Sequence, residues 1–143
     1  MRYCSSSDLA VITRAKQLCS YVMTVTQKSP KAFRFTFVSR LQNLALDVVE
    51  YLFRANETFV AAGDSGAVTR RLELQHQAST SLKMLVYIVE MAAQQGCLLM
   101  KQCEQISAQA LDGAIKRMLR QRSRQRMLQK LASAQRTGGA YCT

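Results

Sequence analysis

The stretch FVSRLQNLALDVVEYLFRA, residues 37–55, decides the fold class of this chain. Its apolar side chains recur at intervals of four and three residues, the spacing that places them on one face of an α-helix. Further apolar residues flank that stripe, as expected of a helix that packs against more than one neighbour. The stripe consists of Phe37, Leu41, Leu44, Val48, Tyr51 and Ala55. The pattern predicts a long helix, which we expect to run from residue 32 to residue 62.

Two more segments repeat apolar residues at the same helical spacing, and they predict helices over residues 7–26 and 67–95. Pro30 separates the first helix from the second, because proline donates no N–H and disfavours helix at the preceding residue. Gly63 and Gly66 mark the next connection, and Gly96 suits the end of the third helix. The two stripes are Val11, Ala15, Leu18, Val22 and Val25, then Ala78, Leu82, Leu85, Val89 and Ala92.

A fourth helix is expected to begin at Ser107 as N-cap, with Ile106 and Leu111 in the two positions of a hydrophobic staple. A short turn of helix over residues 97–105 precedes it in this interpretation. Its core side continues to Leu119, after which residues 120–126 read RQRSRQR and offer no apolar contact. Met127, Leu128 and Leu131 restore a stripe only briefly. We therefore expect a helix whose first half packs and whose second half projects or lies on the surface.

The composition points to an all-α protein. One proline and six glycines are too few for the regular turns of an all-β fold, and 48% hydrophobic residues indicate a folded core. Three long stripes and a shorter one, joined by brief connections, predict an antiparallel up-down-up-down four-helix bundle. We assign residues 1–119 to this bundle and residues 120–143 to a basic C-terminal extension of helix four and tail.

Positive charge is concentrated at the C-terminal end of the chain. Of a net charge of +11, most comes from Lys116 onward, where eight basic residues stand without an acidic one. Such a concentration attracts a polyanion, because neutralised phosphates release their counterions. A solvated helix end or disordered tail is the alternative interpretation. Arginine outnumbers lysine here, and its planar fork suits phosphates and stacking on unpaired bases.

Other basic residues lie within the predicted bundle. Lys31, Arg34 and Arg40 surround the turn before the second helix, and Arg70 and Arg71 stand near the start of the third. In an antiparallel bundle, Arg70 and Arg71 share an end with the distal part of helix four and would join its arginines. Because no RNA-recognition aromatic pair is present, we expect electrostatic, largely sequence-independent binding. The candidate nucleic-acid-binding residues are Lys31, Arg34, Arg40, Arg70, Arg71, Lys116, Arg117, Arg120, Arg122, Arg124, Arg126 and Lys130.

Signals for other classes are weak. No run of about 18 apolar residues occurs, so we expect no membrane span, and the N-terminus lacks the apolar run of a secretory signal. Five cysteines without a CxxC pair favour a reduced, cytoplasmic protein. No phosphate loop, HExxH, GxSxG or Glu-x-x-His motif occurs, so we expect no catalytic residue, metal or cofactor. Asp47 and Glu50 are expected in a solvent or interface ion-pair role, and His76 at a surface or interface.

The run QKSPKAFRFTFVSRLQNLALDVVEYLFRAN, residues 27–56, resembles a family of small four-helix-bundle proteins. That family includes the accessory variability determinants of diversity-generating retroelements and has the rRNA intervening-sequence proteins as relatives. The Pro30–Lys31 turn, the segment 40–45, Arg70–Arg71, the segment 82–96 and a fourth helix started by Ser107 carry the likeness, which covers residues 10–120. Relatives often end the fourth helix in Gly-Trp, where this chain has RQRSRQR.

The resemblance implies a nonenzymatic accessory subunit that forms a homopentameric barrel with a positive surface. Such a barrel binds the element's reverse transcriptase with its template RNA and cDNA, and supports mutagenic cDNA synthesis and retrohoming. Arg34, Arg40, Arg70 and Arg71 match basic positions of the family. Phe33, Phe35, Tyr51 and Phe53 are candidates for the interface between subunits. Two alternatives remain open: a ribosome- or rRNA-associated bundle protein, and a small DNA-binding protein of the mobilisation or repressor type.

Overall fold

The computed structural model describes residues 6–138, and within that range it contains helices and no strand. Its α-helices are α1 (Ser6–Thr26), α2 (Ser39–Glu57), α3 (Ser65–Gln94), α4 (Met100–Ala110) and α5 (Gly113–Gly138). A 3₁₀ turn, η1 (Lys31–Phe33), and a π turn, η2 (Arg34–Val38), lead into α2. The all-α class is confirmed for the described part of the chain.

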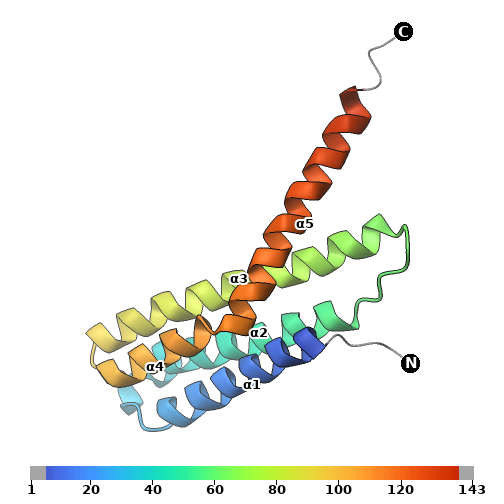
Figure 1. The fold of residues 1–143 in the computed structure, drawn as a ribbon. Coiled ribbons are helices and arrows are strands. Elements are labelled where there is room, and N and C mark those ends of the chain that lie inside the picture. The colour runs from blue at the N-terminus through green and yellow to red at the C-terminus, as the bar shows by residue number, and fades with distance from the viewer. Residues whose placement is uncertain (1–5, 139–143) are drawn as a thin grey trace.

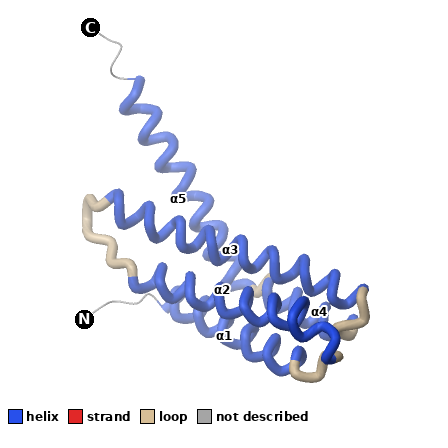
Figure 2. Tube along the Cα trace, turned by 180° about the vertical axis from the view of Figure 1, so that it is seen from behind, coloured by secondary structure: helices blue, strands red, loops and turns tan. Residues whose placement is uncertain are grey.

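Helices α1 to α4 lie alongside one another, and α5 leaves them at an angle (Figures 1 and 2). Helix α2 packs against α1 and α3, and α4 packs against α3 and α1. The base of α5 contacts α1 and α3, while its C-terminal half extends beyond the other helices. We call α1 to α4 the helical body. Within residues 6–138, no helix is both long and apolar enough to cross a membrane.

The core of the body consists of the predicted stripes. Every residue of the stripes in α1 and α3 is buried, and so are four of the six in α2. The exceptions are Phe37 and Tyr51, which are partly buried, while Leu52 faces the core instead at 3% exposed. Full burial of a side chain such as Leu41 or Leu85 contributes roughly 1.5–3 kcal/mol, so these stripes hold the body together.

The second helix is shorter and less regular than predicted. Pro30 adopts an extended conformation (ψ 141°), and the chain then winds through η1 and η2 before α2 begins at Ser39. At the other end α2 stops at Glu57 rather than residue 62, and Thr58 is extended. Phe59 is 77% exposed, so the residues after Glu57 meet no core that would extend the helix.

The prediction that the fourth helix begins at Ser107 was wrong. Ser107 lies inside α4, because Cys103, Ile106 and Ala110 continue a buried stripe through that position. The N-cap is Asp112, whose Oδ1 accepts a hydrogen bond of 2.9 Å from the Ala114 N–H. Two helices therefore replace one, and the break between them sets the direction of α5.

The expected staple at this break is also absent. Leu111 is 56% exposed and lies between the two helices rather than inside the second. Helix α5 then runs without interruption through residue 119, where we placed the boundary between bundle and extension. The Arg14 Nε lies 3.8 Å from the Asp112 Oδ2, which ties α1 to the break.

Candidate nucleic-acid interface

Helix α5 is held to the body by its first two turns. Ala114, Ile115 and Met118 are buried in the common core, with Ile115 only 1% exposed. Met127, Leu128 and Leu131 are each more than half exposed, so the brief stripe they form has no partner within the described part of the chain. The expected division into a packed first half and a projecting second half is confirmed for α5.

One arginine of the RQRSRQR segment is buried where α5 crosses α3. Arg122 is 8% exposed, and its Nη1 lies 2.6 Å from the Nδ1 of His76 on α3. Because a guanidinium has only donors, Nδ1 must accept this bond and the imidazole is neutral. No partner within the described residues satisfies the buried Arg122 Nε. Arg122 therefore joins two helices, whereas the sequence suggested a free contact for nucleic acid.

Burial and like charge disfavour the charged forms of both partners. Partial desolvation lowers the pKa of His76 below its usual 6.5, and the positive charges of Arg122, Arg126 and Lys83 lower it further. Burial, followed by Arg126, lowers the pKa of Arg122 as well. The expectation of a surface or interface position for His76 is met, because its ring is exposed and contacts a second helix.

Beyond this crossing, α3 and α5 diverge (Figure 1). Side chains of both helices line an open cleft of about 430 Å³. Ser65 and Thr69 line its α3 wall with hydroxyl groups. No lining residue is acidic. The α5 wall consists of Arg126, Gln129, Lys130, Ala132, Ser133 and Arg136. We call this site the α3–α5 cleft. It places three cationic side chains opposite the Ser65 hydroxyl, a set of groups that suits phosphate oxygens. The Thr69 hydroxyl donates to the Ser65 carbonyl oxygen at 2.9 Å.

Other arginines of α5 lie on its outer side. Arg120 and Arg124, together with Leu119, Ser123 and Met127, line a shallow depression. Lys116 and Arg117 are exposed too. Arg120 and Arg124 therefore occupy a different side of α5 from Arg122, which contacts α3, and Arg126, which lines the cleft. Helix α5 therefore offers two basic surfaces, of which only one faces α3.

Arg70 and Arg71, near the start of α3, differ in their exposure and in their contacts. Arg71 Nη2 lies 3.0 Å from the Oδ2 of Asp8, so its charge is matched by a carboxylate that joins α1 to α3. Arg70 is exposed. The start of α3 does approach the distal half of α5, as expected, but Ser65 and Thr69 make that approach.

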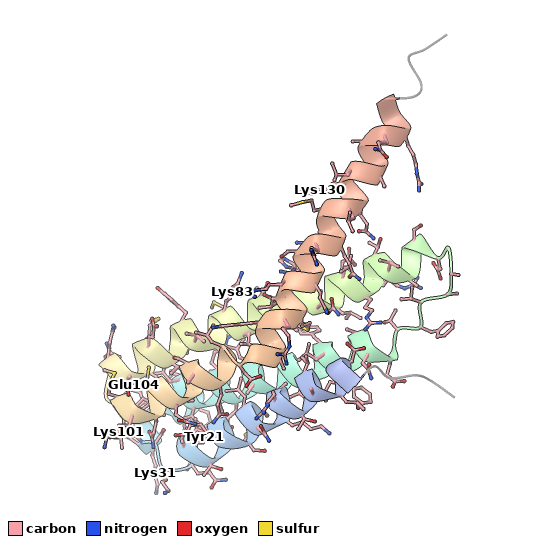
Figure 3. All side chains as sticks on the ribbon, in the orientation of Figure 1. Tyr21, Lys31, Lys83, Lys101, Glu104 and Lys130 are labelled. Carbon is pink, nitrogen blue, oxygen red and sulfur yellow. The ribbon has the colours of Figure 1, made fainter. Side chains whose placement is uncertain are left out.

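Lys31, Arg34 and Arg40 are exposed, and the structure does not bring them together with α5. Figure 3 shows Lys31 at the far end of the body from Lys130, at the end where Lys101 also lies. The candidate residues therefore form separate groups, one at the turn before α2 and one along α5.

Three acidic residues, Asp8, Glu50 and Asp112, pair with arginines of the body rather than with those of α5. Glu50 pairs with Arg54 at 2.7 Å, which confirms the expected ion pair for that residue. Among the described residues, no basic side chain of α5 forms an ion pair, and no group of three or more His, Cys, Asp or Glu side chains is arranged to hold a metal. Cys19, Cys97 and Cys103 are free thiols, while Cys4 and Cys142 lie outside the described residues.

Reasoning from the sequence missed Arg136, Ser65 and Thr69 as cleft residues. Arg136 follows Gln129 by seven residues and Ser133 by three, so a helical wheel continued through these two cleft residues would have placed it on the same wall. Nothing in the local sequence marks the two hydroxyl residues. No protein-family model matches this chain, and no curated protein and no solved structure matches it.

Proposed function

We propose that this protein is a nonenzymatic, cytoplasmic nucleic-acid-binding subunit whose α3–α5 cleft holds the sugar–phosphate backbone of RNA or cDNA. One observation carries the proposal. Seven of the eight basic side chains from Lys116 onward are exposed, and no acidic residue accompanies them. Three of the seven line one wall of the cleft.

The binding is electrostatic and independent of base sequence. Arginine and lysine contacts to phosphates fix a backbone without reading bases. The open cleft between two diverging helices suits a flexible single strand, which can bend to reach Arg126, Lys130 and Arg136, better than one rigid duplex. The arginines of α5 that are exposed leave their guanidinium planes open to solvent, so unpaired bases can stack on them.

The biological setting follows from the family resemblance. The protein acts as an accessory subunit of a diversity-generating retroelement, where it binds the reverse transcriptase and presents template RNA during mutagenic cDNA synthesis and retrohoming. In this proposal, helices α1 to α4 form the antiparallel up-down-up-down bundle of this family, and α5 is displaced from it at the break formed by Leu111 and Asp112.

A homopentamer is part of this proposal. Large apolar side chains on the outside of the body support it, because they are suited to an interface between subunits. Phe35 is 88% exposed and Phe53 54%, and Tyr87 on α3 is 60% exposed. Phe33 and Tyr51, the other two interface candidates, are partly buried against the core.

Two matched triple variants test the nucleic-acid contact. The cleft variant replaces Arg126, Lys130 and Arg136 by glutamine, and the outer-face variant does the same at Arg117, Arg120 and Arg124. Both lose the same charge, so general attraction falls equally. The affinity for a single-stranded RNA oligonucleotide is measured by fluorescence anisotropy over a series of salt concentrations.

We expect the slope of log affinity against log salt to fall in magnitude by about 2 in the cleft variant. Each phosphate contact contributes about 0.7 to that slope for single strands, and the variant removes three basic side chains. The outer-face variant keeps most of the wild-type slope. Equal losses in the two variants would refute the cleft as the binding surface. A wild-type protein that does not bind RNA at low salt would overturn the function as a whole.

The retroelement setting needs its own experiment. The protein is coexpressed with a reverse transcriptase encoded beside its gene, and the two are purified together after nuclease treatment. Retention of the polymerase indicates a protein–protein contact, and the cleft variant separates that contact from bridging by RNA. A protein that leaves the polymerase and copurifies with ribosomes would contradict the retroelement assignment.

A further inference from the structure

Arg122 is a buried positive charge without a negative partner. Its only hydrogen-bond partner among the described residues is the neutral ring of His76, and its Nε is buried and unsatisfied. A buried charge normally has a counter-charge, because desolvation without one is expensive. Arg71 on α3 has such a counter-charge, since the carboxylate of Asp8 on α1 pairs with it. The surroundings of Arg122 therefore lack an anion.

More positive charge surrounds the pair. Lys83 from α3 and Arg126 from α5 both act on His76, and Arg126 also acts on Arg122. Figure 3 shows Lys83 on α3 beside the crossing of α5. No carboxylate is among the groups that shift either partner. We call this set the basic cluster: His76, Lys83, Arg122 and Arg126.

Solvent reaches the cluster, and the α3–α5 cleft leads to it. His76, Lys83 and Arg126 are exposed, so an anion meets no barrier of apolar side chains. Arg126 also lines the cleft, and Arg122 lies one helical turn closer to the point where α5 meets α3. The cluster therefore adjoins the cleft through Arg126.

We propose that the basic cluster binds one phosphate group and that His76 takes up a proton when it does. Phosphate oxygens supply the missing counter-charge and accept hydrogen bonds from the guanidinium groups, as arginine–phosphate pairs commonly do. The source is either a backbone phosphate of nucleic acid or a free phosphate ion. Only the choice of nucleic acid as the source rests on the proposed function.

Proton uptake follows from the geometry of the pair. Without an anion, His76 offers a lone pair to Arg122, and a proton on Nδ1 would place two donors against each other 2.6 Å apart. An anion that draws the two side chains apart removes that conflict, because each group then donates to the anion instead of meeting the other. Binding and protonation are reciprocal, so the anion raises the pKa of His76 and binds more tightly as the pH falls. A rise of about one unit corresponds to a tenfold gain in affinity across the titration.

His76 is the only histidine of the chain, so its ring protons give unambiguous NMR signals. The full-length protein is titrated with acid in chloride, in sulfate at the same ionic strength, and with a single-stranded oligonucleotide. Sulfate serves as the phosphate mimic because it does not itself titrate in this range. We expect sulfate and the oligonucleotide each to raise the pKa of His76 by about one unit over chloride.

Single-charge variants locate the effect. Lys83→Gln and Arg126→Gln are expected to abolish most of the sulfate-dependent shift, while Arg124→Gln, on the other side of α5, keeps it. All three replace exposed side chains, and circular dichroism checks that the variants stay helical. A His76 pKa that is the same in sulfate and chloride would overturn the proposal, as would equal shifts in all variants.

The oligonucleotide separates this proposal from the proposed function. If sulfate shifts the His76 pKa and the oligonucleotide does not bind at all, the phosphate site stands with a free anion as its ligand and the proposed function fails. If the oligonucleotide binds without moving the His76 pKa, nucleic acid is excluded from the cluster while the cleft retains its role.

Discussion

The attachment of α5 to the body predicts that two side-chain truncations on this helix differ sharply in their effect on the free energy of unfolding. Ile115 is 1% exposed in the core, whereas Leu131 is 57% exposed on the projecting half. Each is replaced by alanine, the best helix former, so any loss reports side-chain packing and not helix propensity. The pair therefore measures where α5 is anchored.

The magnitudes follow from burial. Removing a buried isoleucine side chain costs about 2–5 kcal/mol, because the transfer free energy is lost and a cavity is left. Ile115 is among the largest fully buried side chains, so we expect Ile115→Ala to lower the free energy of unfolding by about 3 kcal/mol. Leu131→Ala removes a largely solvated side chain and should change it by less than about 0.5 kcal/mol.

Urea denaturation followed by circular dichroism measures both changes. With a slope of about 1–3 kcal/mol per molar urea, the Ile115 variant unfolds at a midpoint lower by at least about 1 M, and the Leu131 variant is nearly unchanged. Equal costs would show that the distal half of α5 packs as firmly as its base and would refute the projecting arrangement. A cost at Leu131 that grows with protein concentration would assign that packing to a second copy.

Further predictions concern a turn, a titration and the assembly. Gly96 has φ +78°, so Gly96→Ala should lower the free energy of unfolding, measured by urea denaturation, by about 1–2 kcal/mol. Gly113→Ala is the control, because a Cβ at Gly113 meets open space and should cost nothing. Equal costs in the two variants would contradict the left-handed turn at Gly96. Because the pKa of His76 in the folded protein lies below 6.5, the neutral ring stabilises the fold above that pH, and this stability is lost as the pH falls through the lowered pKa. Comparing wild type with His76→Gln between neutral and acidic pH isolates the effect, and parallel curves would disprove it. For the homopentamer, light scattering should give about five times the mass of one chain, and a monomer at micromolar concentration would exclude it.

The helices of the body could be predicted from the sequence because their signal is local. Val22, Leu41 and Val89 each belong to a stripe that repeats at helical spacing, and that repeat requires only that one side of each helix leave water. The charge of α5 was equally visible, since no carboxylate follows Asp112. The fold class and the basic end of the chain are properties of the sequence by itself.

The site depends on contacts between residues far apart in sequence. Serine and aspartate are both favoured N-cap residues, so Ser107 and Asp112 were both candidates for the start of the last helix. Ser107 lies inside α4 instead, because the buried stripe through Ile106 continues past it. That choice turns α5 away from the body and across α3. Only the crossing buries Arg122 against His76 and opens a cleft in front of Arg126. Periodicity assigns each side chain to a face of its helix, whereas the packing of the helices sets which element that face meets. The tertiary structure alone therefore showed which arginines contact another helix and which ones are candidates for phosphate binding.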